Sequence, residues 1–205
     1  SVSMSDFFSF IITDLFKEYG VLLYDSGDKR FRKLQSGYLQ EMVRKHREIN
    51  QAVRDQQADI LKKGYQPAIQ MDEKNANLFL YEKEERILLE FDSELDRFTG
   101  KSNEVSLSAE ALLDIAVQTP GKLSNNVVTR PLMQEKLFPV LAFISGPGEI
   151  AYWAELKRVF EEFGIKMPIL VPRMNITIIE PKVAKCIEDT ETDLYEVLVK
   201  GADEA

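Results

Sequence analysis

Apolar positions in the last third of the chain follow a strand pattern and then a helix pattern. Residues 140–144 form an apolar run without alternation, typical of a strand covered on both faces. Glycines 146 and 148 interrupt it and predict a turn with permissive backbone. Helical spacing then runs from Glu149 to Gly164, where a helix should end. The apolar positions are Ile150, Trp153, Leu156, Phe160 and Phe163. This pattern predicts an α/β unit.

The amino-terminal segment repeats this order of elements. Residues 6–20 predict an amphipathic helix that ends at Gly20, and residues 21–24 a buried strand followed by a polar turn. Residues 167–173 predict another short apolar strand. Because ligands of α/β sheets bind at the carboxyl ends of strands, Asp25 in the turn is a candidate polar group. A purely structural role in the turn is the commoner use of such an aspartate.

The middle of the chain has a different character. Residues 29–63 predict one long polar helix, broken near Ser36-Gly37, whose narrow apolar stripe favours packing on a single neighbour. His46 falls on the charged face of this helix, which predicts a surface histidine. Strands are predicted at 78–81, 86–91 and 105–107, and a helix from the N-cap Ser108 to Pro120-Gly121. We therefore predict core segments at 1–28 and 123–180, a long helix at 29–63, an α+β insert at 64–122, and helices at 181–205.

Composition and charge narrow the class of protein. The chain has 205 residues, 44% of them hydrophobic and 29% charged, as expected of a soluble globular protein. A net charge of −8 argues against a general nucleic-acid binder. The single cysteine and single histidine argue against a disulfide framework, a histidine-based metal site and a catalytic triad, so we predict no metal. The chain shows neither a membrane-spanning run nor a signal peptide, and we expect a cytoplasmic protein.

The turn between the predicted strand and helix is a candidate anion site. Unpaired backbone amides at a helix N-terminus attract carboxylates and phosphates. The turn matches neither the phosphate-binding loop with its lysine nor the dinucleotide fingerprint, so an ordinary βα connection is the favoured explanation of the turn taken by itself. The candidate residues of the turn are Ser145, Gly146, Gly148 and Glu149.

Two arginines could complete such a site. Arg130 lies in a cluster that also holds Asn125, Asn126 and a threonine, and Arg173 follows the strand predicted at 167–173. A guanidinium fork suits a carboxylate or a phosphate, although both arginines could equally form structural ion pairs. Tyr152, one helical turn beyond the glycines, could reach a ligand there.

Several motifs resemble the bacillithiol-biosynthesis cysteine-adding enzymes, the BshC family. They follow one another in the family's order through nearly the whole chain. The motifs are Phe16–Gly27, Glu48–Arg54, Asn75–Phe79, Leu123–Pro139, Ala142–Trp153 and Met167–Arg173. The resemblance implies an α/β fold with a partial Rossmann-like (nucleotidyltransferase-like) core, in which the long helix and the α+β insert form a connecting-peptide subdomain.

Members of that family are longer, and this chain resembles their central part. The resemblance implies that part of the Rossmann-like core and the coiled-coil region that mediates homodimers lie elsewhere. The isolated chain should then be inactive, because its core is incomplete. The helix at residues 7–16 and the surroundings of Trp153 should expose apolar surface.

The resemblance also implies an activity. The family is assigned to the last step of bacillithiol biosynthesis, a carbon–nitrogen ligation of L-cysteine, through its carboxyl group, to the amine of glucosaminyl-malate. ATP or another nucleotide is the expected activating agent. We expect Asn125, Asn126 and Arg130 to contact substrate, the 146–149 amides to take a carboxylate or phosphate, and Tyr152 and Arg173 to anchor it. The alternative is a non-catalytic folding or dimer-interface module whose glycine turn is structural.

Overall fold

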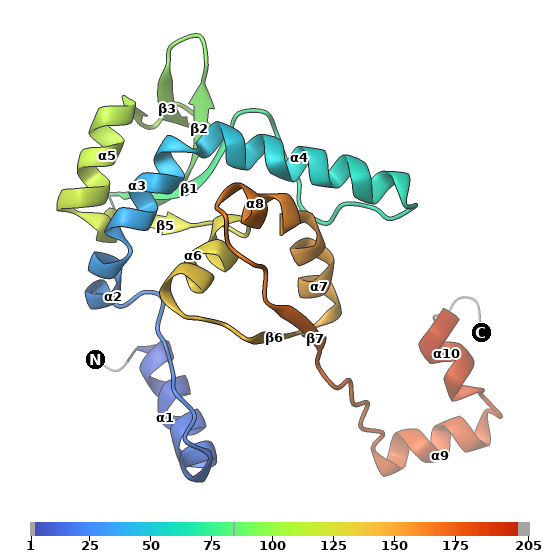
Figure 1. Cartoon of the computed structure of the whole chain (residues 1–205). Coiled ribbons are helices and arrows are strands. Elements are labelled where there is room, and N and C mark those ends of the chain that lie inside the picture. Colours follow the sequence, from blue (N-terminus) through green and yellow to red (C-terminus); the bar gives the residue numbers. More distant parts are fainter. Residues whose placement is uncertain (1–2, 84, 201–205) are drawn as a thin grey trace. The chain divides into compact units, whose positions relative to one another are not determined.

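The computed structural model describes residues 3–83 and 85–200, which fall into two compact units (Figure 1). The first unit extends to Pro172, and the second begins at Arg173. The predicted features at residues 1–2, 84 and 201–205 lie outside the described residues.

An antiparallel sheet of five strands, in the order β4-β3-β2-β1-β5, organises the first unit. The predicted hairpin is confirmed as β1 and β2, and the short third strand as β4. Strand β3 was not predicted, because it is four residues long and carries no alternating pattern. Strand β5, which pairs with β1, was not predicted either. The strands are β1 Asn75–Glu82, β2 Glu85–Asp92, β3 Arg97–Gly100, β4 Ser106–Leu107 and β5 Leu123–Asn125.

The predicted long helix is three helices in the structure. The chain breaks at Gln35, beside the predicted position, and again at Lys45, which was not predicted. The expected single neighbour is also wrong, because the apolar stripe enters the main core, where helix α4 (His46–Lys62) packs on both β1 and helix α8 (Lys157–Glu162) (Figure 1). The helices are α2 Lys29–Leu34, α3 Ser36–Arg44, α4 His46–Lys62, α5 Ala109–Gln118, η2 Pro120–Lys122, α6 Thr129–Leu137 and α8 Lys157–Glu162. The capping role of Ser108 is confirmed, since its hydroxyl accepts the Ala111 N–H at 3.2 Å.

His46 is half-buried, and the prediction of a surface histidine is wrong. Its ring lies 4.4 Å from the Phe91 ring and 4.7 Å from the Phe98 ring, measured between centroids. Nδ1 lies 2.8 Å from the Val43 carbonyl oxygen, whereas Nε2 is buried and has no hydrogen-bond partner among the described residues. The break at Lys45 starts a new helix at His46 and so turns the ring toward the sheet. Burial lowers the pKa of His46.

This burial predicts a stability that falls with mild acid. Because the folded-state pKa lies below the unfolded value of about 6.5, the unfolded chain binds the proton more readily. The contribution of His46 is therefore complete above about pH 6.5 and is lost as the pH falls toward the folded-state pKa. We expect the free energy of urea unfolding to decrease between pH 7 and pH 5, and His46→Phe to flatten that decrease. Parallel curves for the two proteins would contradict the assignment.

The predicted strand–turn–helix unit is confirmed, with one correction. Strand β6, Ala142–Ser145, leads into α7, Pro147–Trp153, and then through η3, Ala154–Leu156, and α8 to the parallel strand β7, Ile169–Pro172. Phe143 stacks on Trp153 with 4.6 Å between ring centroids, and Trp153, expected near exposed apolar surface, is only 1% exposed. The strand is not covered on both faces, because Ile144, which faces away from Phe143, is 68% exposed.

The amino-terminal helix is confirmed as α1, Met4–Phe16, followed by η1, Lys17–Tyr19, and by Gly20 in the left-handed conformation. Its apolar side chains are largely exposed, as predicted. The buried strand expected at 21–24 is wrong: these residues pair with no described strand, and Leu22 is 95% exposed. A strand needs a neighbour for its backbone groups, which an apolar run alone does not specify.

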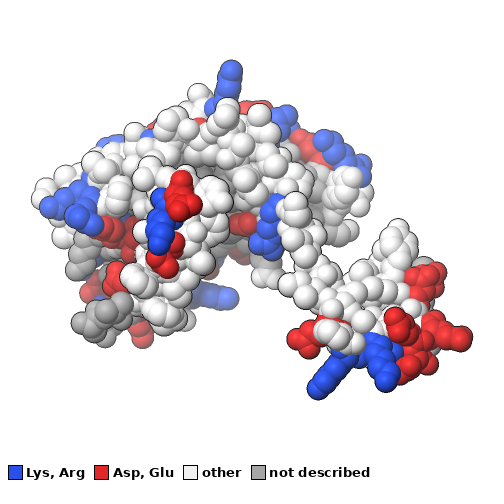
Figure 2. All heavy atoms as spheres, turned by 90° about the horizontal axis from the view of Figure 1, so that it is seen from below, with Lys and Arg blue, Asp and Glu red and all other residues white. Residues whose placement is uncertain are grey.

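The second unit, described by itself, contains α9, Pro181–Asp189, and α10, Leu194–Lys200, in line with the helices predicted there. Among the described residues, no helix has both the length and the apolar character to cross a membrane. Lysines and arginines on the face seen in Figure 2 are scattered among acidic and uncharged side chains and do not form one basic patch.

Candidate functional site

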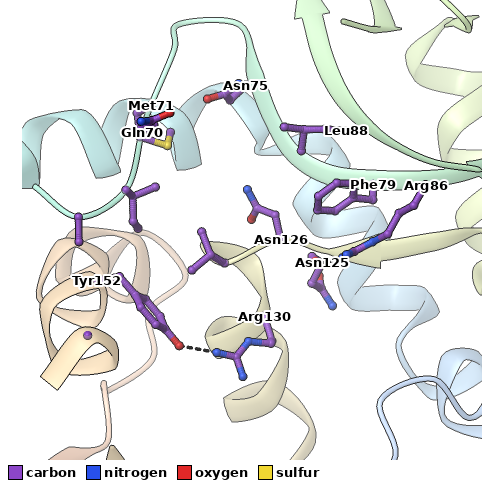
Figure 3. Close-up of a pocket in the computed structure, with 14 residues that line it drawn as sticks. Gln70, Met71, Asn75, Phe79, Arg86, Leu88, Asn125, Asn126, Arg130 and Tyr152 are labelled. Atoms are coloured by element: carbon purple, nitrogen blue, oxygen red, sulfur yellow. Dashed lines mark hydrogen bonds between the residues drawn. The ribbon is translucent and has the colours of Figure 1, made fainter. Parts of the chain in front are cut away.

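A cavity of about 660 Å³ lies in the first unit and collects half of the predicted site residues (Figure 3). Its walls come from strands β1 and β2, from the loop at 68–71, from the segment before α6 and from α7. The predicted residues among its lining are Asn125, Asn126, Arg130, Gly148 and Tyr152.

Strand periodicity explains one wall of this cavity. Leu78 and Leu80 face the core, so the residue between them, Phe79, faces the other way together with its cross-strand partner Leu88. Arg86 covers the Phe79 ring, with its guanidinium carbon 3.8 Å from the ring centroid, and donates to the Asn125 carbonyl oxygen at 3.0 Å. The sequence did not point to Arg86, because an arginine after a charged turn resembles ordinary hairpin surface.

A small polar network ties two distant motifs together beside the cavity. Asn77 has φ 59° at an irregularity in β1, a conformation that asparagine tolerates. Its backbone oxygen accepts the Thr129 hydroxyl at 2.7 Å, and its side-chain oxygen accepts the Asn126 amide at 3.0 Å. The Asn126 side-chain oxygen in turn accepts the N–H groups of Val128, at 2.9 Å, and Thr129, at 3.1 Å. Asn126 therefore positions the start of α6, and its contact with substrate stays a prediction.

Arg130 and Tyr152 meet across the cavity, as the dashed line in Figure 3 shows. The Arg130 Nη2 donates a hydrogen bond to the phenolic oxygen of Tyr152, which leaves the tyrosine proton free to point at a ligand. Asn125 lines the same space, and its Oδ1 is buried without a hydrogen-bond partner among the described residues. The site thus offers a cation, a hydroxyl and a carboxamide to one ligand.

A second cavity, of about 560 Å³, adjoins the first and contains Asp25. The two cavities share Arg86, Asn125 and Arg130 in their linings. The second is also lined by Arg32, whose Nη1 donates to the Leu123 carbonyl oxygen at 3.0 Å. Burial lowers the pKa of the Arg32 guanidinium. The sequence did not point to Arg32 either, because the polar side of this helix resembles a solvated face.

The arginines of these cavities lack acidic partners. No described carboxylate forms a salt bridge with Arg32, Arg86 or Arg130, although the chain has a net charge of −8. Elsewhere arginines do pair with carboxylates, as in Arg54–Glu73 and Arg158–Asp59. Three guanidinium groups that form no salt bridge with a described carboxylate, around two adjoining cavities, favour an anionic group of a ligand.

The turn before α7 is less open to a ligand than predicted. The carboxylate of Glu149 accepts the Gly146 N–H at 3.1 Å and so occupies the helix N-terminus itself. Ser145 and Gly146 are buried and line neither cavity, and the Ser145 hydroxyl has no hydrogen-bond partner among the described residues. The expected permissive backbone is wrong, since Gly146 has φ −76° and Gly148 also lies outside the left-handed region. Ligand contacts of Ser145, Gly146 and Glu149 stay predictions.

The turn glycine at 148 should be replaceable. An added Cβ at Gly148 would meet no heavy atom within 4 Å, and the residue lies in the first turn of α7. We expect Gly148→Ala to raise the free energy of urea unfolding by about 0.5–1 kcal/mol, because alanine loses less backbone entropy in a helix. Gly164→Ala is the matched contrast: its φ of 63° predicts a loss of stability. Equal losses in both variants would disprove this view of the turn.

Arg173 is the first residue of the second unit and is exposed. It directly follows Pro172, which pairs with Ser145 in the parallel ladder. Its anchoring role stays a prediction. Among the described residues, no group of three or more histidine, cysteine, aspartate or glutamate side chains is placed to hold a metal ion.

Comparison with known proteins gives a consistent result. The family described as "Bacillithiol biosynthesis BshC, N-terminal Rossmann-like domain" matches residues 1–174. A relative named "Putative cysteine ligase BshC" from Geobacillus kaustophilus is 42% identical over 200 residues, which are 98% of this chain and 37% of the relative. Relatives of the same name from Geobacillus thermodenitrificans and Bacillus cytotoxicus are 43% and 42% identical over 97% of this chain and 35% of their own length.

The chain is therefore a mixed α/β protein of the Rossmann-like class, as its βαβ unit and the matched family domain agree. It belongs to the BshC family. It spans somewhat more than a third of the length of the curated relatives it matches. The predicted connecting-peptide insert, and the position of this chain in the centre of longer members, stay predictions.

Proposed function

We propose that this chain supplies substrate-binding residues to a carbon–nitrogen ligase that joins L-cysteine to glucosaminyl-malate in the last step of bacillithiol biosynthesis. The relatives' name, cysteine ligase, and the family description, bacillithiol biosynthesis, support the class of reaction. The observation that carries the proposal is the set of three arginines without acidic partners around two joined cavities. Malate contributes two carboxylates, which such guanidinium forks would recognise.

Each wall of the first cavity suits a part of glucosaminyl-malate. Arg130 and Tyr152 would hold a malate carboxylate, the arginine with its fork and the tyrosine with its free proton. Asn125, which lines the cavity, would bind sugar hydroxyls through its side-chain carboxamide. Phe79 and Leu88 would lie against the apolar face of the sugar ring. Anchoring of substrate by Arg173 is a further proposal.

The reaction forms an amide when the sugar amine attacks the carboxyl carbon of cysteine, and one carboxylate oxygen leaves with an activating group. We propose a nucleotide such as ATP as the source of that group. The turn at 145–149 does not fit its phosphates, because the Glu149 carboxylate already occupies the helix N-terminus. We therefore assign no residue of this chain to the nucleotide. We further propose a cytoplasmic homodimer for the longer protein, and no turnover by this chain alone.

Calorimetry tests the proposal. Glucosaminyl-malate titrated into the chain should give saturable heat with one site per chain, and free malate should bind more weakly because it lacks the sugar contacts. The alternative, a non-catalytic folding or dimer-interface module, predicts no saturable heat with either compound. That result would refute the substrate-binding role.

A further inference from the structure

The two cavities share a boundary, which suits a reaction between two substrates. Arg86, Asn125 and Arg130 line both of them, so ligands in the two cavities would meet at these residues. Joining two molecules is accelerated when their reacting groups are held side by side. Under the proposed function, the first cavity binds glucosaminyl-malate, the larger substrate and the acceptor of the reaction. The second cavity then has no assigned ligand.

The second cavity carries both signs of charge. Asp25 lies on its rim, where its Oδ1 accepts the Gly27 N–H at 2.7 Å and fixes the turn. Asp25 attracts Arg32 electrostatically, but no ion pair joins them, and no described lysine or arginine pairs with this carboxylate. Arg32 uses Nη1 for Leu123 and Gln35, and its other guanidinium N–H groups have no acceptor among the described residues. A carboxylate and a guanidinium thus lie in one cavity without neutralising each other.

We propose that the second cavity binds a zwitterionic α-amino acid, with its ammonium on Asp25 and its carboxylate on Arg32 and Arg86. This inference rests on the proposed function, in which the amino acid is L-cysteine. The orientation places the carboxyl group at the shared boundary, beside Arg130 and the acceptor. Tyr24 and Tyr81 supply aromatic surface for a side chain, and the Gln35 amide holds the Tyr24 hydroxyl at 2.9 Å.

The charge pattern favours an amino acid over a nucleotide in this cavity. A triphosphate would bring several negative charges to a space whose rim holds the Asp25 carboxylate. An ammonium group would instead be attracted to it. A ligand with one charge of each sign matches the separated carboxylate and guanidinium.

The test uses calorimetry on the chain with reduced L-cysteine. Asp25→Asn and Arg32→Gln should each weaken binding at least tenfold. Asp114→Asn and Arg44→Gln remove the same charges from exposed positions outside both cavities and should leave affinity unchanged. Cysteamine lacks the carboxylate, so Arg32→Gln should not alter its binding. N-acetylcysteine lacks the ammonium, so Asp25→Asn should not weaken it.

The outcomes separate this inference from the proposed function. Three results with cysteine would refute the amino-acid site while binding of glucosaminyl-malate leaves the acceptor site standing. Cysteine could give no heat, it could bind the site variants and the control variants equally, or it could compete with glucosaminyl-malate. If neither ligand gives saturable heat, the proposed function fails as well. Asp25 is exposed and asparagine also supports turns, so Asp25→Asn decides the question even if Arg32→Gln does not fold.

Discussion

Arg130→Ala should weaken the binding of glucosaminyl-malate to this chain by about ten- to thirtyfold. A hydrogen bond to a charged group contributes about 1.5–3 kcal/mol, and solvent around the exposed Arg130 favours the lower part of that range. The variant also removes the donor that orients the Tyr152 hydroxyl. Calorimetry at fixed salt measures the change, since exposed charges are screened by ions.

Three further variants define what the Arg130 experiment means. Arg130→Lys keeps the charge but not the fork, so an intermediate loss is expected. Tyr152→Phe keeps the ring and removes only the hydroxyl. Arg44 lies on an exposed face of α3 and, among the described residues, its side chain hydrogen-bonds only Gln40. Arg44→Ala should therefore bind glucosaminyl-malate as the parent chain does. Equal affinity in Arg130→Ala and Arg44→Ala would remove Arg130 from the site.

The local sequence pattern correctly predicted the helices and strands whose caps, turns and apolar spacing lie within the element itself. Ser108 caps α5, Gly164 ends the helical run with φ 63°, and the strand, turn and helix near residue 145 form as expected. The failures depend on neighbours distant in sequence. Residues 21–24 have the composition of a buried strand but no described partner strand, and His46 is buried by two strands that start more than 30 residues later.

The site was predictable where one segment concentrates unusual chemistry. The six residues 125–130 hold two amides, a hydroxyl and a guanidinium, and all three predicted members line the first cavity. Arg86 and Arg32 were not predictable, because each looks like ordinary surface until the sheet and α2 place them beside that segment. At the glycine turn, Glu149 itself places a carboxylate at the helix N-terminus, and ligand binding there stays a prediction.

Glu155 shows how a residue with no signal in the sequence can shape the site. It is only 1% exposed, and no described cation pairs with it. Its Oε1 accepts the Ala68 N–H at 2.5 Å, and its Oε2 accepts the Gln57 amide at 2.7 Å. Ile69 also donates to it, at 3.2 Å to Oε1. Because residues 68–71 line the first cavity, Glu155 fixes that wall to the helical segment that follows Tyr152.

Glu155→Ala should lower the free energy of urea unfolding by about 2–4 kcal/mol and also weaken glucosaminyl-malate binding. The change removes the acceptor that the Ala68 and Ile69 N–H groups and the Gln57 amide share, and a hydrogen bond to a charged group contributes about 1.5–3 kcal/mol. Glu155→Gln keeps one acceptor oxygen and should lose much less. Glu161 is exposed, and Lys157 one turn away is its only salt-bridge partner among the described residues, so Glu161→Ala should stay within about 0.5 kcal/mol of the parent chain. A Glu155→Ala protein as stable as Glu161→Ala would mean that the loop is held by its apolar contacts alone, and that this carboxylate has no part in forming the cavity.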